Sequence, residues 1–450
     1  MHVVNLASLL MEEKKDKTAI GLNGGDLERE LMRKGSDGNK TTVANFAVMA
    51  SVCRHLQGAF PDIPVLCEED TELLQSDEEF ATTIASFLSE YGIVDAKVED
   101  VKEWTRHAGS YVASLKGGVL PDTFWALMPI DTTPEFVESK QYNMSLALIK
   151  DGQPVISFIG CPVMAFDHNS RTVPHSNGCP LFYASAGQGA WTQLIVMERE
   201  NGVYQGKYRL RGPSLKLNVS DKIKRGHDGL YDFLGSEQLR IAMGSRSRED
   251  IFRDAERIGK LLGSEYPKFD FLNSAMKYCW LSRGECDVVW YLKNGLYDNS
   301  ATERLVSHAA GCLVAMESGA AVADLDGKAL DWSCGPILEN NRGVLATDPK
   351  KVPLRGIRDA IEKATASSME AYEVRCEKRK EVSKMLSYLF NNVAKFAETD
   401  EEREAAKIVQ AKGMKMLDNT EEMDQLAQEQ INRGTPILGE RAVEDDAFGQ

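Results

Sequence analysis

Three strand-like segments follow one another between residues 124 and 161, so this part of the chain must contain a sheet. Residues 124–131 (FWALMPID) form an apolar run that ends in a proline and an aspartate. Residues 142–150 and 154–161 form two further segments, and the Asp151-Gly152 pair between them is a strong hairpin signal. We therefore expect three consecutive strands, the last two joined by a tight turn.

Helical patterns lie on both sides of these strands. Apolar residues recur at helical spacing in residues 43–57, 77–90, 249–263, 276–287 and 301–317. Shorter strand-like segments lie between them, at residues 65–67, within 180–245 and at 288–292. This long alternation predicts an α/β (α+β) fold in which sheets and helices form layers.

The chain has 450 residues, which is more than one compact core usually holds. Changes in composition along it suggest a division into consecutive parts. These are a polar, partly helical N-terminal segment (1–40), an N-terminal α+β domain (41–165), a C-terminal α/β domain (166–350) and a helical extension with an acidic tail (351–450).

The helical extension is rich in Glu, Lys, Ala and Met. It contains an apolar stripe at helical spacing, formed by Met385, Leu386, Leu389, Phe390, Val393 and Phe396. Residues 405–416 suggest a second helix. Such a stripe is expected to be buried, either against the rest of the chain or against a protein partner that binds through residues 354–430.

The charge of the chain limits its partners. It carries 53 Lys and Arg against 68 Asp and Glu, a net charge of -15. Repulsion between such a surface and a polyanion argues against binding to a nucleic-acid polymer, although a basic pocket could still hold a small anion. No apolar run reaches the roughly 18 residues that cross a membrane, so we expect no membrane partner.

The nine cysteines lie mostly in apolar runs, with no CxxC pair and no zinc-like His/Cys spacing. We interpret them as buried free thiols, which are typical of a reducing compartment. The N-terminal residues are not typical of a secretory signal. We therefore expect an intracellular location, cytoplasmic by default, with a plastid or a mitochondrion as open alternatives.

Several blocks of polar residues follow apolar segments along residues 40–348. They are Glu68-Glu69-Asp70, residues 128–133 (MPIDTT) with their continuation 141–162, and residues 307–311 (SHAAG) preceded by Lys277-Tyr278-Cys279. These blocks resemble the GEE, D-P-I-D-G-T and W-D-H-A-A-G motifs of the inositol monophosphatase superfamily. Residues 141–162 and 277–279 are especially similar to its 3'(2'),5'-bisphosphate nucleotidases.

The resemblance implies a layered αβαβα sandwich and a magnesium-dependent phosphatase site between two domains. In the family, Mg²⁺ ions bind the substrate phosphate, activate a water and stabilise the leaving oxygen. Mg²⁺ prefers oxygen ligands, mostly carboxylates. A Glu after the first strand, both aspartates of D-P-I-D-G-T and the Asp of W-D-H-A-A-G supply them, and a further Asp orients the attacking water.

Only part of this carboxylate set is present. Glu68 and Asp131 match metal ligands of the family. Met128 and Ser307 replace two others, and a thioether is a poor ligand for Mg²⁺. Asn45 replaces the water-orienting aspartate and cannot take a proton from water. The resemblance therefore implies Mg²⁺ as the cofactor, whereas these residues put its binding in doubt.

The resemblance also implies a substrate-binding set. Thr132 replaces the Gly of D-P-I-D-G-T, and Thr133 matches its Thr, which belongs to the catalytic and phosphate-binding groups. Ser274 and Lys277 match nucleotidase residues that hold substrate, and Lys293 lies where the family has an Arg or Lys. These cations could hold an adenosine bisphosphate-like ligand or another small phosphate without metal.

Structural alternatives exist for the same residues. Glu68-Glu69-Asp70 could be a solvated loop, and Asp131 could cap a helix beside Thr132 and Thr133. The lysines could form surface salt bridges. We interpret His308 as a helix-packing residue, because Ser307 replaces the adjacent Asp.

Three hypotheses follow for the function. The first is a catalytically impaired or inactive bisphosphate nucleotidase-like protein, a pseudophosphatase that acts as a scaffold or binds a ligand. The second is a metal-independent nucleotide- or anion-binding module. The third is an active Mg²⁺-dependent phosphatase that hydrolyses 3'-phosphoadenosine 5'-phosphate or an inositol phosphate, with Glu69, Asp70 or Glu135 in place of the missing ligands.

Overall fold

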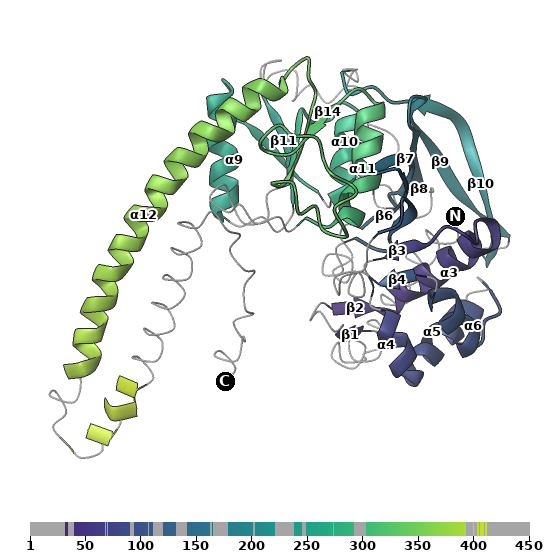
Figure 1. Cartoon of the computed structure of the whole chain (residues 1–450), viewed down its shortest axis with the longest axis horizontal. Coiled ribbons are helices and arrows are strands. Elements are labelled where there is room, and N and C mark those ends of the chain that lie inside the picture. The colour runs from purple at the N-terminus through teal and green to yellow at the C-terminus, as the bar shows by residue number, and fades with distance from the viewer. Residues whose placement is uncertain are drawn as a thin grey trace.

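Two β-sheets and the helices around them make up most of the described chain (Figure 1). The computed structural model describes residues 32–34, 40–67, 69, 71–90, 94–106, 108–110, 120–131, 142–162, 164, 179–200, 203–220, 238–244, 249–272, 274–291, 303–392, 399, 403–404, 406–408 and 410–411. A separate ladder pairs β1 (Met32–Lys34) with β2 (Lys40–Thr42).

The larger sheet has eight strands in the order β10-β9-β8-β7-β6-β5-β3-β4. Their bounds are β3 (Val65–Cys67), β4 (Ala108–Ser110), β5 (Thr123–Met128), β6 (Met144–Lys150), β7 (Gln153–Gly160), β8 (Cys179–Ser185), β9 (Gly189–Glu200) and β10 (Val203–Lys216). Strand β3 pairs in parallel with β4 and β5, and every other pairing in this sheet is antiparallel. The predicted hairpin is confirmed, because Asp151 and Gly152 both have positive φ angles, 51° and 70°, as a two-residue turn requires.

The smaller sheet has five strands in the order β12-β11-β13-β15-β14. Their bounds are β11 (Arg240–Met243), β12 (Lys268–Phe271), β13 (Val288–Tyr291), β14 (Ala321–Ala323) and β15 (Val344–Thr347). Strand β11 is parallel to β12 and β13, and β15 is antiparallel to both of its neighbours.

Helices separate and cover the two sheets. The described helices are α3 (Val43–Ala59), α4 (Thr71–Ser76), α5 (Glu78–Glu90), α6 (Val98–Arg106), α9 (Glu249–Leu261), α10 (Ser274–Ser282), α11 (Leu305–Glu317) and α12 (Leu354–Asn392). Helices α3, α5 and α6 pack on one face of the larger sheet, α10 and α11 fill the space between the sheets, and α9 and α12 pack on the far face of the smaller sheet. The predicted αβαβα order of layers is therefore confirmed.

Successive side chains of a strand point to opposite faces of the sheet, and this alternation explains the layers. In β5, Trp125 and Leu127 point into the outer apolar cluster with α3, whereas Ala126 and Met128 point into the cluster around α10 and α11. Since both faces of this strand are covered, it reads in the sequence as a continuous apolar run.

Two sequence expectations need revision. The sequence predicts one helix over residues 276–287, but α10 ends at Ser282 because Gly284 adopts a positive φ of 68° and turns the chain toward β13. Strands β8, β9 and β10 pair within the larger sheet although they follow the expected domain boundary at residue 165. We therefore propose a boundary between β10 and β11.

The described cysteines are free thiols, and only Cys334 among them is not fully buried. Burial raises the pKa of the Cys53 thiol to about 12, which keeps it protonated and unreactive. No described helix is both long enough and apolar enough to cross a membrane.

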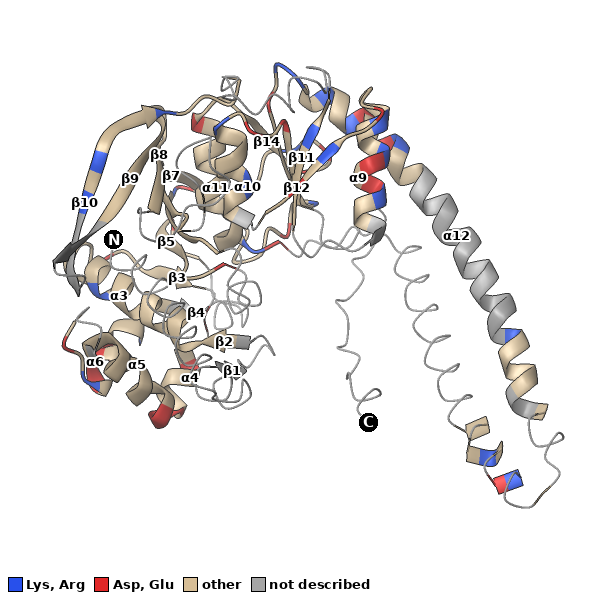
Figure 2. Cartoon of the chain, turned by 180° about the vertical axis from the view of Figure 1, so that it is seen from behind, with Lys and Arg blue, Asp and Glu red and all other residues tan. Residues whose placement is uncertain are grey.

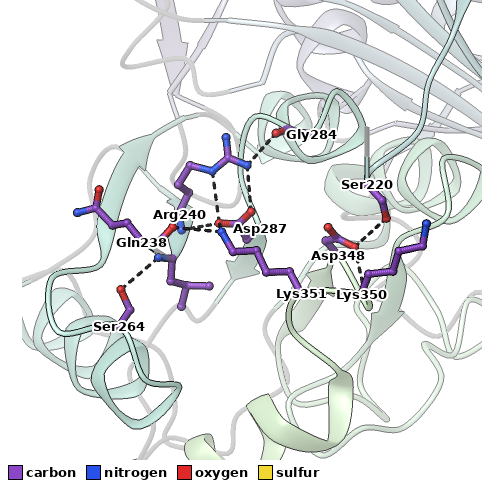
Figure 3. A network of polar contacts seen from close by, with 10 residues as sticks. Ser220, Gln238, Arg240, Ser264, Gly284, Asp287, Asp348, Lys350 and Lys351 are labelled. Atoms are coloured by element: carbon purple, nitrogen blue, oxygen red, sulfur yellow. Dashed lines mark hydrogen bonds and ion pairs between the residues drawn. The ribbon is translucent and has the colours of Figure 1, made fainter. Parts of the chain in front are cut away.

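Ion pairs hold the segment before α12 to the smaller sheet (Figure 3). Asp287 accepts hydrogen bonds from the Arg240 guanidinium at 3.0 Å and from Lys351 Nζ at 2.8 Å. Burial alone would raise the pKa of Asp287, but these two cations hold it below its usual range. The base of α12 is therefore anchored where β11 and β13 begin.

The contact between α10 and α11 depends on Gly311. A Cβ atom at this position would overlap the ring of Tyr278, which is fully buried and hydrogen-bonded to His308. We expect Gly311→Ala to lower the free energy of unfolding by about 2 kcal/mol, measured by urea denaturation. Gly58→Ala is the control, since nothing lies within 4 Å of a Cβ there. Equal stability of the Gly311→Ala variant and the natural chain would contradict this packing.

Candidate functional site

The first part of the site lies where α3 begins. Thr42 is the N-cap of α3, and its hydroxyl accepts from Asn45 N at 3.3 Å and donates to Asn45 Oδ1 at 2.6 Å. This contact turns the amide nitrogen of Asn45 toward Glu69, whose Oε1 it meets at 2.6 Å. The hydroxyl of Thr41 donates to the other oxygen, Glu69 Oε2. Both carboxylate oxygens of this buried Glu69 therefore have protein donors.

The orientation of Asn45 bears on its chemistry. Its Oδ1 faces the Thr42 hydroxyl and its Nδ2 faces the Glu69 carboxylate. An amide cannot accept a proton from water, and here both of its ends are already engaged. Asn45 and Glu69 thus form a closed hydrogen-bonded pair.

Asn45→Asp tests this arrangement. It would place a second carboxylate beside Glu69 Oε1, where Asn45 Nδ2 now lies at 2.6 Å. Two buried carboxylates so close cannot both ionise freely, so the pKa of one is raised above its unfolded value. The folded chain then binds the extra proton more tightly, and stability falls as the pH rises through this window.

We expect Asn45→Asp to lower the free energy of unfolding by about 2 kcal/mol at pH 7 and by less at pH 5, measured by urea denaturation. Asn45→Ala is the matched control, because it loses the same hydrogen bonds without adding a charge. The loss of unfolding free energy in Asn45→Ala should be the same at both pH values. If Asn45→Asp lost the same unfolding free energy at both pH values, the close contact between residue 45 and Glu69 would be contradicted.

The second part of the site lies after β5, around Asp131. Asn143 Nδ2 donates to Asp131 Oδ2 at 3.2 Å, and the backbone N of Ala275, in the first turn of α10, donates to the same oxygen at 3.4 Å. A carboxylate at a helix N-terminus is stabilised by the free backbone N–H groups and by the helix dipole. Asp131 therefore faces the start of α10.

Lys277 is the most unusual residue of the site. Its side chain is fully buried, and its Nζ has no hydrogen-bond partner among the described residues. The ammonium lies 4.4 Å from the centroid of the Tyr291 ring. Burial lowers the pKa of Lys277 from 10.5 to about 8, although the charges of Asp131 and Glu303 oppose this shift. Perturbed groups of this kind often mark functional sites.

His308 contacts the same Tyr291 ring as Lys277 and lies in a closed set of contacts. Its Nε2 lies 3.1 Å from Glu303 Oε2, and its Nδ1 lies 2.7 Å from the hydroxyl of Tyr278. The ring also packs edge-on against Tyr291, with the ring centroids 4.9 Å apart. Both nitrogens have partners, and His308 is fully buried, as expected of a helix-packing residue.

The positions with replaced ligands lie as follows. Met128 is buried in the apolar cluster between the larger sheet and α10 and α11, and it pairs with Ser145 across β6. Ser307 is half-buried in the first turn of α11. Neither side chain can replace a carboxylate as a strong ligand for Mg²⁺.

Several expected site residues lie outside the described residues. They are Glu68, Asp70, Thr132, Thr133, Glu135 and Lys293, and of Ser274 only the backbone is described. In the described part of the chain, no three or more His, Cys, Asp or Glu side chains come together as a metal-binding group.

The structure adds residues that the sequence did not single out. Asn143 and Ala275 contact Asp131, Thr41 contacts Glu69, and Glu303 contacts His308. Asn143 directly precedes β6 within the block that resembles the nucleotidases, which is the only signal that could have indicated it. Glu303 lies four residues before Ser307, but nothing in its local sequence indicates that it faces Lys277.

Two curated proteins are similar in sequence to this chain over most of its length. A 3'(2'),5'-bisphosphate nucleotidase of Schizosaccharomyces pombe is 28% identical over 344 residues, which cover 74% of this chain and 85% of the relative. The probable 3'(2'),5'-bisphosphate nucleotidase 4 of Arabidopsis thaliana is 28% identical over 344 residues, which cover 74% of this chain and 87% of the relative.

Among solved structures, a staphylococcal IMPase-I complexed with products aligns with a TM-score of 0.42 and 15% identity, covering 78% of this chain and 92% of that chain. The model of the inositol monophosphatase family matches residues 5–366, which is well over half of the 450 residues. This chain belongs to the inositol monophosphatase family.

Proposed function

We propose that this chain is a bisphosphate nucleotidase-like protein that is impaired or inactive in catalysis and that binds a small phosphate ligand without a magnesium cluster. The ligand class is a 3'-phosphoadenosine 5'-phosphate-like molecule, by similarity to the relatives named above. The protein would act as a ligand-binding protein or as a scaffold.

One observation carries this function: a buried ammonium lies within electrostatic reach of Asp131, which matches a metal ligand of the family. Lys277 is fully buried, close enough to Asp131 and Glu303 for their charges to raise its pKa, and has no hydrogen-bond partner among the described residues. Its N–H groups have no hydrogen-bond partner among the described residues, so a phosphate oxygen that reached them would accept charge-assisted hydrogen bonds, which are strong. A buried cation also supplies part of the positive charge that metal ions would otherwise supply.

The hydrogen bonds that the carboxylates Glu69 and Asp131 already accept support the same proposal. Glu69 already accepts from Thr41 and Asn45, and Asp131 accepts from Asn143 and the start of α10. These donors already occupy part of the hydrogen-bonding capacity of both carboxylates. With Met128 in an apolar cluster, the described residues offer no carboxylate at that position.

The alternative is an active Mg²⁺-dependent phosphatase that acts on 3'-phosphoadenosine 5'-phosphate or an inositol phosphate. It requires Glu68 together with Asp70 or Glu135 to complete a ligand set with Asp131. Clustered Mg²⁺ ions need several carboxylates because the cations repel one another.

Isothermal titration calorimetry with 3'-phosphoadenosine 5'-phosphate tests the proposal. We expect binding in the presence of a chelator, with a Kd that Mg²⁺ changes little. Lys277→Met should weaken binding at least about tenfold, whereas Lys260→Met, on the exposed face of α9, should leave it unchanged. Binding that appears only with Mg²⁺ would support the active phosphatase instead.

A further inference from the structure

Strand β10 forms one edge of the larger sheet, at the opposite end from β4 (Figure 1). Among the described strands it pairs with β9 alone, so its outer edge presents backbone N–H and C=O groups to which a further strand could add. The pairing with β9 keeps one register from Tyr208 to Arg211, and a bulge follows in which Gly212 has a φ of 74°. Residues 208–211 therefore form a regular stretch of this edge.

The side chains of residues 209–216 in β10 are all exposed. Leu210 is 50% exposed and Leu215 is 47% exposed, although a strand that packs on a core buries its apolar side chains. Because side chains alternate along a strand, Arg209 and Arg211 point to one face and Leu210 points to the other. A partner at this edge can therefore contact cations on one face and an apolar side chain on the other.

The hairpin of β9 and β10 is basic, whereas the chain as a whole is acidic. Residues 189–216 carry five Lys and Arg against two Asp and Glu, a net charge of +3, and the whole chain has a net charge of -15. The coloured part of β10 carries blue segments and no red ones (Figure 2). Such a local excess of cations attracts an anionic partner and repels a cationic one.

The charges of β10 disfavour a second copy of the same strand at this edge. When two copies of β10 pair antiparallel about Leu210, Arg209 of one copy lies opposite Arg211 of the other. Like charges directly opposite each other destabilise a sheet, and cations on an edge strand are a common device against self-pairing. The same cations favour a strand of opposite charge.

The alternation of side chains favours an extended peptide over a flat anionic surface. A flat surface such as a membrane contacts only one face of the strand, either the cations or Leu210. A peptide that adds to the edge continues the sheet, so its alternate side chains lie on both faces. Acidic residues of the peptide then lie opposite Arg209 and Arg211, and an apolar residue lies opposite Leu210.

We propose that the outer edge of β10 at residues 209–211 is a docking site for an extended acidic peptide of a partner protein, in which acidic and apolar residues alternate. Backbone hydrogen bonds to the strand edge supply part of the affinity, and the charges of Arg209 and Arg211 select the acidic sequence. None of these residues belongs to the candidate functional site, so the docking site stands independently of the function proposed above.

Fluorescence polarisation of a dye-labelled peptide, titrated with the full chain, tests the proposal. The probe has about eight residues of alternating glutamate and valine, which is enough for one strand. We expect saturable binding, and the double variant Arg209→Glu and Arg211→Glu should weaken it at least about tenfold. This variant should instead bind a probe of alternating lysine and valine. Arg355→Glu removes an exposed cation at the start of α12 and is the control, which should bind the acidic probe as the natural chain does.

Changes to the probe test the natural chain directly, whatever the variants do to its folding. An acidic probe with methylated nitrogens at alternate backbone amides should not bind, because it cannot pair with a strand edge. Binding that survives this methylation would show attraction between charges alone and would overturn the proposal. It would also be overturned if the natural chain bound the lysine probe as tightly as the acidic one, or if it bound vesicles containing phosphatidylserine but not the acidic probe.

Discussion

Replacement of Lys277 by methionine is expected to stabilise the folded chain. The buried ammonium has a pKa of about 8 in the folded state, against 10.5 in an unfolded chain. This shift already includes the attraction of Asp131 and Glu303, so the charged form has a net cost of roughly 3 kcal/mol. Methionine fills a similar volume without the charge, and the free energy of unfolding at pH 7 should rise by about that amount.

The stability difference between Lys277→Met and the natural chain should change with pH in a defined direction. Between pH 8 and 10.5 the unfolded chain binds more protons at Lys277 than the folded chain does, so the natural chain gains stability as the pH rises. The advantage of Lys277→Met should therefore be full below pH 8 and should vanish near pH 10.5. Urea denaturation at both ends of this range measures it, with Lys260→Met as an exposed control that should show no such change.

A Lys277→Met variant that is less stable than the natural chain at pH 7 would contradict this account. It would mean that the attraction of Asp131 and Glu303 exceeds the cost of burial. The buried ammonium would then stabilise the fold, and its burial would no longer indicate a ligand site.

Restoration of the three missing carboxylates is expected to produce the largest functional change. The variant Asn45→Asp, Met128→Asp and Ser307→Asp places carboxylates at the positions that resemble the metal ligands and the water-orienting group of the family. Without Mg²⁺ the variant should be less stable than the natural chain, because Asn45 and Met128 are almost fully buried and an unpaired carboxylate there is costly. With Mg²⁺ it should regain stability.

Thermal unfolding measures the stabilisation by Mg²⁺, and phosphate release measures the restored activity. The midpoint of unfolding of the restored variant should rise as Mg²⁺ is added, since a ligand that binds only the folded chain stabilises it. The variant should also release phosphate from 3'-phosphoadenosine 5'-phosphate at least about 100-fold faster than the natural chain. A midpoint that does not respond to Mg²⁺ would contradict the match between these positions and a metal site.

The local features of the fold could be predicted from the sequence because they depend on neighbouring residues. The hairpin at Asp151-Gly152 follows from two residues that tolerate positive φ angles. The apolar run of β5 follows from burial of both of its faces. The length of α10 could not be predicted, because the turn at Gly284 depends on the packing of the chain against β13.

The environment of the site could not be predicted because it is made of distant contacts. Asp131 and Ala275 meet although 144 residues separate them, and Asn45 meets Glu69 across 24 residues. Lys277 could be identified by resemblance, but its complete burial depends on how α10 and α11 pack between the two sheets. The sequence alone does not show which of these distant residues come into contact, because that depends on the packing of the whole fold.

Phosphate release by the natural chain tests the central claim most directly. The protein is incubated with 3'-phosphoadenosine 5'-phosphate and Mg²⁺, and free phosphate is measured over time beside the restored variant. We predict no release above the protein-free background from the natural chain. Turnover of about 1 s⁻¹ or more, as in ordinary enzymes, would show that other carboxylates complete the metal site and that Met128 does not prevent catalysis.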